Sequence, residues 1–128
     1  MNANEREWID EKIRLVMGAV FEVSNRLGRG FLEKVYERAL QVELNRRGMV
    51  VEQQVGLPVY YKGKQVGDFV ADLMVEQQIL VELKCVNALG NIHTAQCINY
   101  LQASGLKVCL LVNFQHPRIQ WKKLVNNL

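Results

Sequence analysis

Two carboxylates and one amine interrupt apolar segments between residues 71 and 85. Asp72 lies in ADLMV, and Glu82 and Lys84 lie in ILVELKC, where most other side chains are suited to burial. Carboxylates that are partly withdrawn from water need a proton or a cation as a partner. Lys84 supplies one positive charge, and a divalent metal ion would supply the rest. Mg²⁺ suits such a cluster because it prefers oxygen ligands and is often held by only one or two carboxylates.

This set of residues is also suited to phosphoryl chemistry. Beside a bound metal ion, an amine can orient the attacking water or stabilise the charge that develops in the transition state. The competing interpretation is an ordinary salt bridge on the exposed face of a sheet, which the same D…E-x-K pattern would produce. The pattern alone leaves both a metal-dependent site and a structural ion pair open.

The register of two predicted strands decides whether the carboxylates meet. Glu82 and Lys84 are two residues apart in a strand, so they project from the same face. If residues 76–78 form a three-residue turn, Asp72 falls directly opposite Glu82, whereas a two-residue turn places the carboxylates on opposite faces. The three-residue turn also gathers the apolar residues of both strands on one face, and we expect this register. These apolar residues are Leu73, Val75, Ile79, Val81 and Leu83.

The rest of the chain must position these strands. Apolar residues recur at steps of three and four over residues 5–27 and 31–47, which predicts two amphipathic helices. Segments rich in β-branched and aliphatic residues follow, with a hairpin turn at Lys62-Gly63. The tail from Arg118 predicts an edge strand, with a short helix as the alternative. The predicted strands span 49–61, 64–75, 78–86 and 107–114, and a third helix spans 92–104.

The order of these elements is ααβββαβ(β), which predicts an α/β fold with a mixed β-sheet flanked by helices. The chain has 128 residues, enough for one domain spanning residues 1–128. Hydrophobic residues make up 49% and charged residues 23% of it, an ordinary globular composition. No apolar run approaches the ~18 residues that would cross a bilayer. The start, MNANEREWIDEK, lacks the apolar region of a secretory signal, so we expect a cytoplasmic protein whose three cysteines are reduced.

The motifs fall in a familiar order. D-x9-E-L-K lies on consecutive predicted strands, a glutamate-bearing helix precedes it, and a helix with Gln and Tyr follows. This arrangement resembles the PD-(D/E)XK nuclease superfamily. Within it, GFLEKVY, with Gly30, Glu33 and Tyr36, resembles the motif that names the GxxExxY protein family. The similarity covers residues 10 to 125.

The resemblance implies a restriction-endonuclease-like core with a metal site on the strand pair. Asp72 and Glu82 would bind Mg²⁺ or Mn²⁺ directly, with the backbone carbonyl of Leu83 as a third ligand. Lys84 would be the catalytic lysine. Glu33 would reach the metal directly or through water; without the resemblance it is a glutamate favoured at a helix N-terminus by the macrodipole.

Two further residues follow from the same resemblance. Gln96 and Tyr100 are similar to the Q-x-x-x-Y feature of related recombination nucleases and would orient water or a substrate phosphate. Their alternative role is a polar helix border. The sequence departs from the family where Ala71 replaces the proline. Asp68, four residues before Asp72, would replace it as ligand if the register were shifted.

The implied function is hydrolysis of DNA phosphodiesters. The alternative is a catalytically silent nucleic-acid-binding or protein-interaction module with the same fold, and a third hypothesis is an RNA-directed enzyme. The net charge of +3 favours anionic partners, and no base-reading module is visible, so we expect contacts to backbone phosphates. Cutting both strands would need two sites, for which a homodimer is the simplest arrangement. The candidate phosphate contacts are Arg26, Arg29, Lys34, Arg38, Arg46, Arg47, Lys62 and Lys64.

Overall fold

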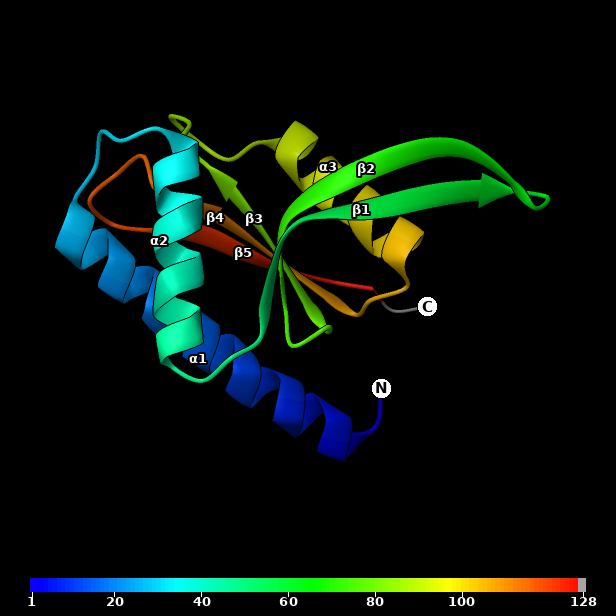
Figure 1. Ribbon diagram of the computed structural model, residues 1–128, viewed down its shortest axis with the longest axis horizontal. Helices are drawn as coiled ribbons and strands as arrows, with labels where there is room; N and C mark the ends of the chain where they lie inside the picture. The colour runs from blue at the N-terminus through cyan, green and yellow to red at the C-terminus, as the bar shows by residue number, and fades with distance from the viewer. Residues whose placement is uncertain (127–128) are drawn as a thin grey trace.

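The computed structural model describes residues 1–126 and arranges them as a sheet between helices (Figure 1). The five strands lie in the order β1-β2-β3-β4-β5. β3 and β4 run parallel and are joined through α3, and the other neighbouring strands pair antiparallel. The elements are α1 (Ala3–Leu27), α2 (Glu33–Arg46), β1 (Val51–Tyr61), β2 (Lys64–Val75), β3 (Ile79–Lys84), α3 (Asn91–Ser104), β4 (Val108–Asn113) and β5 (Gln120–Val125).

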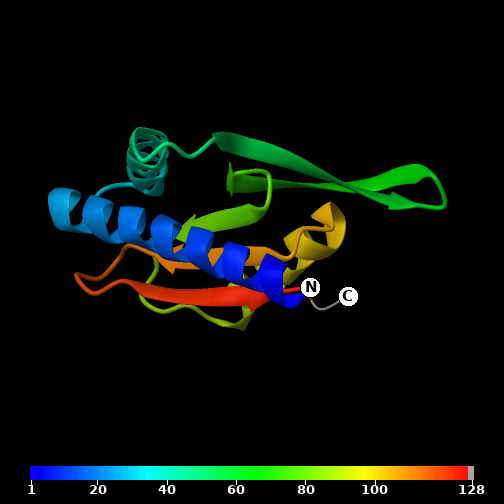
Figure 2. The same cartoon turned by 90° about the horizontal axis from the view of Figure 1, so that it is seen from below.

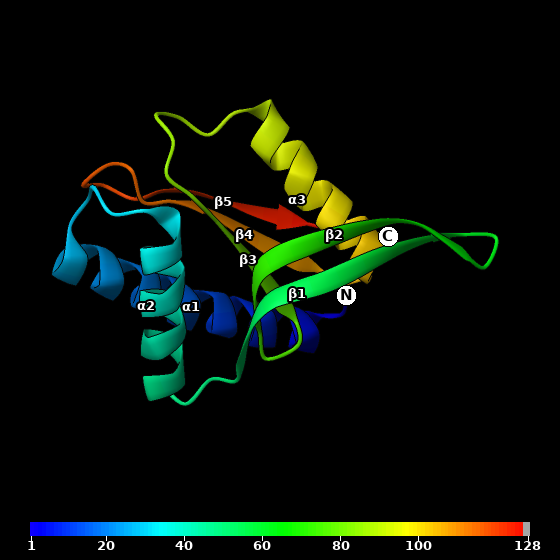
Figure 3. The ribbon, with the colours of Figure 1, turned by 45° about the horizontal axis from the view of Figure 1, so that its top comes forward.

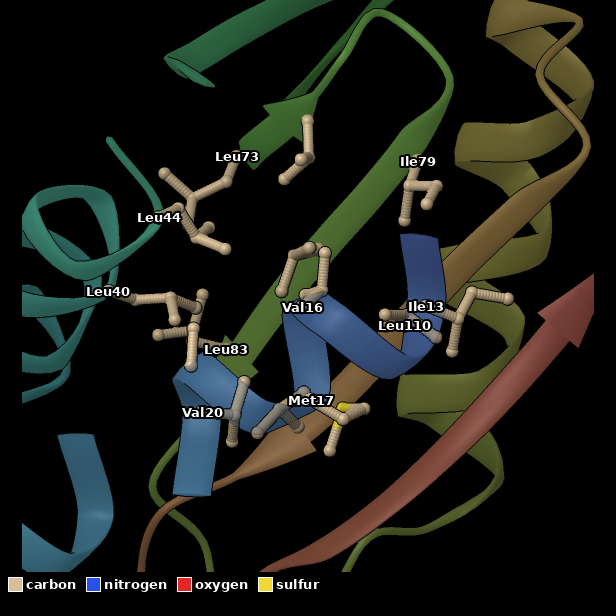
Figure 4. Close-up of a cluster of buried hydrophobic side chains, with 14 of the residues drawn as sticks. Ile13, Val16, Met17, Val20, Leu40, Leu44, Leu73, Ile79, Leu83 and Leu110 are labelled. Carbon is tan, nitrogen blue, oxygen red and sulfur yellow. The ribbon is translucent and has the colours of Figure 1, made fainter. Parts of the chain in front are cut away.

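Two apolar cores hold the layers together. α1 and α2 pack on one face of the sheet around Leu40, Leu73, Leu83 and Leu110 (Figure 4). α3 packs on the other face through Cys97, Tyr100 and Leu101, against a second set of strand residues. Because both faces are covered, β3 and β4 are buried along their length, which is usual for a parallel pair. The mixed sheet flanked by helices and the predicted element order are confirmed, and the tail forms the predicted edge strand.

The ends of the helices explain their bounds. The Asn2 side chain accepts a hydrogen bond from the N–H of Glu5 and caps the start of α1. Gly28 ends α1 with a φ of 70°, a left-handed conformation that glycine adopts without steric cost. α2 begins only at Glu33, so Leu32 stays outside the helix and is 80% exposed. The predicted start of this helix at residue 31, which placed Leu32 inside it, was therefore two residues early.

The predicted register between β2 and β3 is confirmed. Val75 pairs with Ile79 and Leu73 with Val81, across a turn of three residues, 76–78. Glu76 and Gln77 both adopt positive φ in this turn. The two-residue alternative is excluded, and Asp68 lies opposite Pro58 on β1 rather than opposite Glu82.

The β1–β2 ribbon turns over midway along its length. Val51 and Leu73 pack in the core under α1 and α2, whereas Leu57 and Ala71 pack in the core under α3. All four are odd-numbered, and a regular strand would keep them on one face. The change falls between Gln53–Leu73 and Val55–Ala71, where the register itself is unbroken. The reversal is therefore a local twist of both strands, larger than the twist of a regular ribbon.

Gln54 carries the backbone distortion at this point, with a φ of 52°. A non-glycine residue in the left-handed region costs about 1–2 kcal/mol. We expect the free energy of unfolding of Gln54→Gly to be about 1 kcal/mol higher than that of Gln54→Ala. Both variants lose the side-chain amide, but only glycine adopts the positive φ without steric cost. Urea unfolding measures the difference. The pair Gln53→Gly and Gln53→Ala is the control and should show the opposite order; the same order at both positions would contradict the prediction.

No helix within residues 1–126 combines the length and the apolar character needed to cross a membrane.

Candidate active site

Asp72 and Glu82 come together where β2 and β3 stop pairing through their backbones. The backbone ladder between β2 and β3 ends at Leu73–Val81. Beyond it, the N–H of Asp72 donates to Oε1 of Glu82 at 3.3 Å, and the N–H of Leu83 donates to Oδ2 of Asp72 at 2.9 Å. Side-chain carboxylates thus replace backbone carbonyls as acceptors. The two acids lie side by side as the register predicted.

Lys84 and Tyr100 contact the same carboxylate oxygen. Nζ of Lys84 lies 3.4 Å from Oε2 of Glu82, and the hydroxyl of Tyr100 donates to this oxygen at 3.3 Å. Glu82 is only 4% exposed, and Tyr100 is 3% exposed. Tyr100 reaches the site from α3, which lies over this face of the sheet (Figure 3). The structure therefore brings together four of the predicted residues: Asp72, Glu82, Lys84 and Tyr100.

Glu33 is the first residue of α2, which packs on the face of the sheet opposite α3. Much of Glu33 is exposed, yet burial of its carboxyl group raises its pKa, and the charge of Asp72 raises it further. The charge of Lys84 and a hydrogen bond from the backbone of Cys85 oppose this rise. Glu33 therefore belongs to the same electrostatic cluster as Asp72 and Lys84.

Burial governs the protonation of the two central acids. It raises the pKa of Glu82 to about 7, and the neighbouring charge of Asp72 adds to the rise, while Lys84 opposes it. Burial also raises the pKa of Asp72, against the hydrogen bond from the N–H of Leu83. The Tyr100 pKa is raised by burial and by the charge of Glu82, so its hydroxyl stays a hydrogen-bond donor. Lys84 alone thus leaves the carboxylate pair short of positive charge.

Sequence reasoning missed a buried carboxylate beside this pair. Glu37 is 3% exposed, and its oxygens accept hydrogen bonds from Gln53 and Gln54 at 2.9 Å each and from Lys34 at 3.1 Å. Nε2 of Gln54 also lies 3.5 Å from Oδ1 of Asp72, and the charge of Glu37 adds to the rise in the pKa of Asp72. The spacing of Glu33 and Glu37 places both on one face of α2, but it does not reveal the partners of Glu37 on β1.

A divalent cation fits these donors. Two half-buried or buried carboxylates with raised pKa values offer hard oxygen ligands and lack compensating charge. The N–H and C=O of one strand residue point the same way, so the carbonyl of Leu83, like its N–H, faces Asp72. Within residues 1–126, no three His, Cys, Asp or Glu side chains are grouped to hold a metal by themselves. The candidate ligands are two carboxylates and one carbonyl, with water completing the shell, as is common for Mg²⁺.

Three further polar residues of the predicted helices have other surroundings than the carboxylate pair. Gln96 is half-buried on α3, one turn before Tyr100. In the part of the chain that the structure describes, no hydrogen bond joins Gln96 to the acids, and its role stays a prediction. His93 caps the first turn of α3, because its Nδ1 accepts a hydrogen bond from the N–H of Gly90 at 2.9 Å. Tyr36 ties the loop before α2, since its hydroxyl donates to the carbonyl of Gly28 at 2.7 Å.

The candidate phosphate-binding residues fall into three groups. Arg26, Lys34 and Arg47 form ion pairs with glutamates of their own helices, at 2.9, 3.1 and 2.8 Å. Lys62 and Lys64 lie at the hairpin between β1 and β2. Arg29, Arg38 and Arg46 are exposed.

In the absence of divalent metal, the strained carboxylate pair should cost the fold stability at neutral and higher pH. A pKa raised by folding means that the native state holds the proton more tightly. This acid therefore costs no stability below about pH 4.5, and the cost grows as the pH rises from about 4.5 to about 7 and stays constant above that. We expect Glu82→Gln to raise the free energy of unfolding by about 2 kcal/mol near pH 8 and by little near pH 4.5. Urea titrations in EDTA measure this. Glu52→Gln, at an exposed position of β1, is the matched control, and an equal gain at both pH values would contradict the prediction.

Comparison with known proteins adds a family and a fold. A family model described as the PD-(D/E)XK nuclease superfamily matches residues 10–124. No curated protein matches the chain. Among solved structures, SSO0001 resembles it with a TM-score of 0.58 and 20% identity, over 74% of this chain and 50% of that one, so the chain spans half the length of that protein. LHK-Exo in complex with dAMP resembles it with a TM-score of 0.50 and 11% identity, over 84% of this chain and 76% of that one. A further solved structure that resembles the chain is that of an alkaline exonuclease (LHK-Exo) from Laribacter hongkongensis.

Proposed function

Because the chain belongs to the PD-(D/E)XK nuclease superfamily, we propose that it is a metal-dependent nuclease that hydrolyses phosphodiester bonds of DNA. Its cofactor would be Mg²⁺ or Mn²⁺. Nucleases of this superfamily generally use divalent metals and act on nucleic acids. The choice of DNA, of the metal and of the residues below is our proposal. So is the assignment of residues 1–128 to a single catalytic domain.

One observation carries this proposal. Asp72 and Glu82 lie next to each other at the end of the β2–β3 ladder, and Lys84 contacts Glu82 at 3.4 Å. Like charges side by side destabilise a strand pair, and an exposed salt bridge would not require two acids withdrawn from water. The arrangement therefore favours a ligand over the ordinary ion pair that the sequence left open.

Each residue has a proposed task. Asp72, Glu82 and the carbonyl of Leu83 would hold the metal ion, which would neutralise charge on the phosphate oxygens. Lys84 would orient the attacking water and stabilise the charge that develops on phosphorus oxygens. Glu33 would act through water, because it does not join the two acids in one ligand cluster.

Tyr100 and Gln96 would act from α3. The hydroxyl of Tyr100 donates to Oε2 of Glu82, which fixes the orientation of this carboxylate. Gln96 lies one turn earlier on the same helix and would contact water or the substrate phosphate. Gly30, Glu33 and Tyr36 further support placing the chain in the GxxExxY branch. There, Glu33 would serve the site, and Tyr36 would fix the loop before it through Gly28.

Cleavage assays test the proposal. Purified protein is incubated with supercoiled, linear and single-stranded DNA, with Mg²⁺, with Mn²⁺ or with EDTA, and with RNA in parallel. We expect cleavage of DNA with metal and none with EDTA. Calorimetry with Mn²⁺ gives a second readout, in which Asp72→Asn should lose binding. Cleavage that persists in EDTA would refute the metal requirement, and DNA binding without cleavage under any metal would favour a silent binding module.

The oligomeric state is a separate part of the proposal. A nuclease that cuts both strands at once needs two sites, so a homodimer would supply them. Light scattering of the protein, with and without DNA, would test this, and a monomer under both conditions would oppose it.

A further inference from the structure

The hairpin formed by β1 and β2 extends past the body of the protein. Figures 1 and 2 show it reaching beyond α3, away from α1 and α2. Towards its turn, Val59, Val66, Gly67 and Phe69 line a hollow together with Asn99, Gln102 and Ala103 of α3. The ring of Phe69 also contacts the ring of Tyr100, with centroids 5.8 Å apart. The hairpin therefore lies against α3 as far as Gly67 and Val66, beside the candidate active site, and its turn extends past this contact.

The tip, which we define as residues 60–65, presents aromatic rings and positive charge to solvent. Tyr60 and Tyr61 are 62% and 61% exposed. Lys62 and Gly63 form the turn with φ values of 49° and 79°, the left-handed pair of a tight two-residue hairpin. No acidic residue lies between positions 60 and 67. The tip is thus a cationic surface with exposed rings.

Tyr61 lies at the centre of this surface. Nζ of Lys62 lies 5.5 Å from the centroid of its ring, and Lys64 is its direct partner across the strands. The ring of Tyr61 therefore has one ammonium group over it, and a second lysine is paired with Tyr61 across the strands. An aromatic face can stack on any base, and lysines at its edge can bind the adjoining phosphates, which is how proteins hold single strands without reading their sequence.

We propose that the tip binds single-stranded DNA, with Tyr61 stacking on a base and Lys62 and Lys64 contacting phosphates on either side. This inference rests on the proposed nuclease function and assigns its substrate class: DNA that carries a single-stranded tract. Duplex DNA does not fit as well, because its bases are already stacked on one another and their faces are closed to Tyr61.

The strand between tip and site sets the length of that tract. Lys64 and Asp72 lie on the same strand, eight residues apart, which spans about 27 Å at the rise of a β-strand. One stacked nucleic-acid strand covers this distance with about eight nucleotides. A substrate much shorter than this would reach Asp72 and Glu82 without touching the tip.

Binding and cleavage assays with matched variants test the proposal. Fluorescence anisotropy in EDTA is measured with a labelled thymidine strand of about 20 nucleotides and with a blunt duplex. We expect Tyr61→Ala to weaken binding to the single strand about tenfold and Tyr61→Phe to leave it unchanged, since the ring is kept. The double variant Lys62→Ala/Lys64→Ala should lower the slope of log affinity against log salt by about 1.4. Lys122→Ala, on the opposite edge strand, is the charge control.

The outcomes separate this inference from the proposed function. With Mg²⁺, Tyr61→Ala should slow cleavage of the long single strand about tenfold but not that of a strand of about five nucleotides. Normal single-strand binding by Tyr61→Ala, or an equal loss on the blunt duplex, would overturn the role of the tip even if the protein cleaves DNA. Binding that depends on Tyr61 in a protein that cleaves nothing would instead refute the nuclease and keep the tip.

Discussion

Asp72→Asn is expected to reduce kcat/KM for DNA cleavage by on the order of 10³-fold. The substitution keeps the size of the side chain but removes the charge that the proposed ligand set needs. It should leave the fold intact, because an amide oxygen can still accept the hydrogen bond from the N–H of Leu83, now 2.9 Å from Oδ2. Melting temperature and far-UV circular dichroism should match the wild type or show a gain in stability, since the variant removes one of two neighbouring carboxylates.

Asp68→Asn is the matched control for this variant. Asp68 lies four residues earlier on β2 and is exposed, and the register places it opposite Pro58. The substitution makes the same chemical change on the same strand, outside the site. We expect activity within about twofold of the wild type, because exposed positions without special contacts tolerate substitution. Loss of activity in Asp68→Asn with retention in Asp72→Asn would move the ligand to Asp68 and refute the site as described.

Lys84→Ala is the second change with a large expected effect, a fall in kcat of on the order of 10²–10³-fold. Its ammonium group lies 3.4 Å from Oε2 of Glu82, and its side chain is only 17% exposed, so water replaces it poorly. Because the proposed task of Lys84 is exerted in the transition state, kcat should fall more than the affinity for DNA. Single-turnover cleavage and anisotropy, measured side by side, separate the two.

Lys123→Ala makes the same loss of charge far from the site. Lys123 lies on β5, and its Nζ is 3.8 Å from Oδ1 of Asp10, in an exposed pair. Such a pair contributes little to stability, so this variant should retain activity. Equal weakening of DNA binding by both substitutions, with kcat unchanged in Lys84→Ala, would reduce Lys84 to a general electrostatic contact.

Much of the site could be predicted because strand geometry alone places its two central acids. The side-chain period of a strand is two, so a three-residue turn and an apolar face were enough to place Asp72 opposite Glu82. The structure confirms this register in the pairing of Val75 with Ile79. The position of Tyr100 near Glu82 followed from the resemblance, and the hydrogen bond at 3.3 Å agrees with it.

Other features had no local signal in the sequence. Glu37 is buried because Gln53, Gln54 and Lys34 converge on it from β1 and its own helix, and no spacing within α2 reveals partners on a strand. The left-handed φ of Gln54 also has no signal in the sequence, because glutamine has no preference for this conformation. The start of α2 was predicted too early because the apolar spacing already begins at Leu32, one residue before the helix.

The turnover of the β1–β2 ribbon at Gln54 separates two halves of one hairpin: a proximal half that packs under α1 and α2, and a distal half that packs under α3 and carries the tip. Because pairing keeps its register through this point, residues could be gained or lost two at a time beyond Gly67 without changing which way Asp72 points. The reach of the protein could thus diversify among homologues while its chemistry stays constant. A single extra residue in one strand would instead need a β-bulge to absorb it, as the register shift between Val59 and Tyr60 already does.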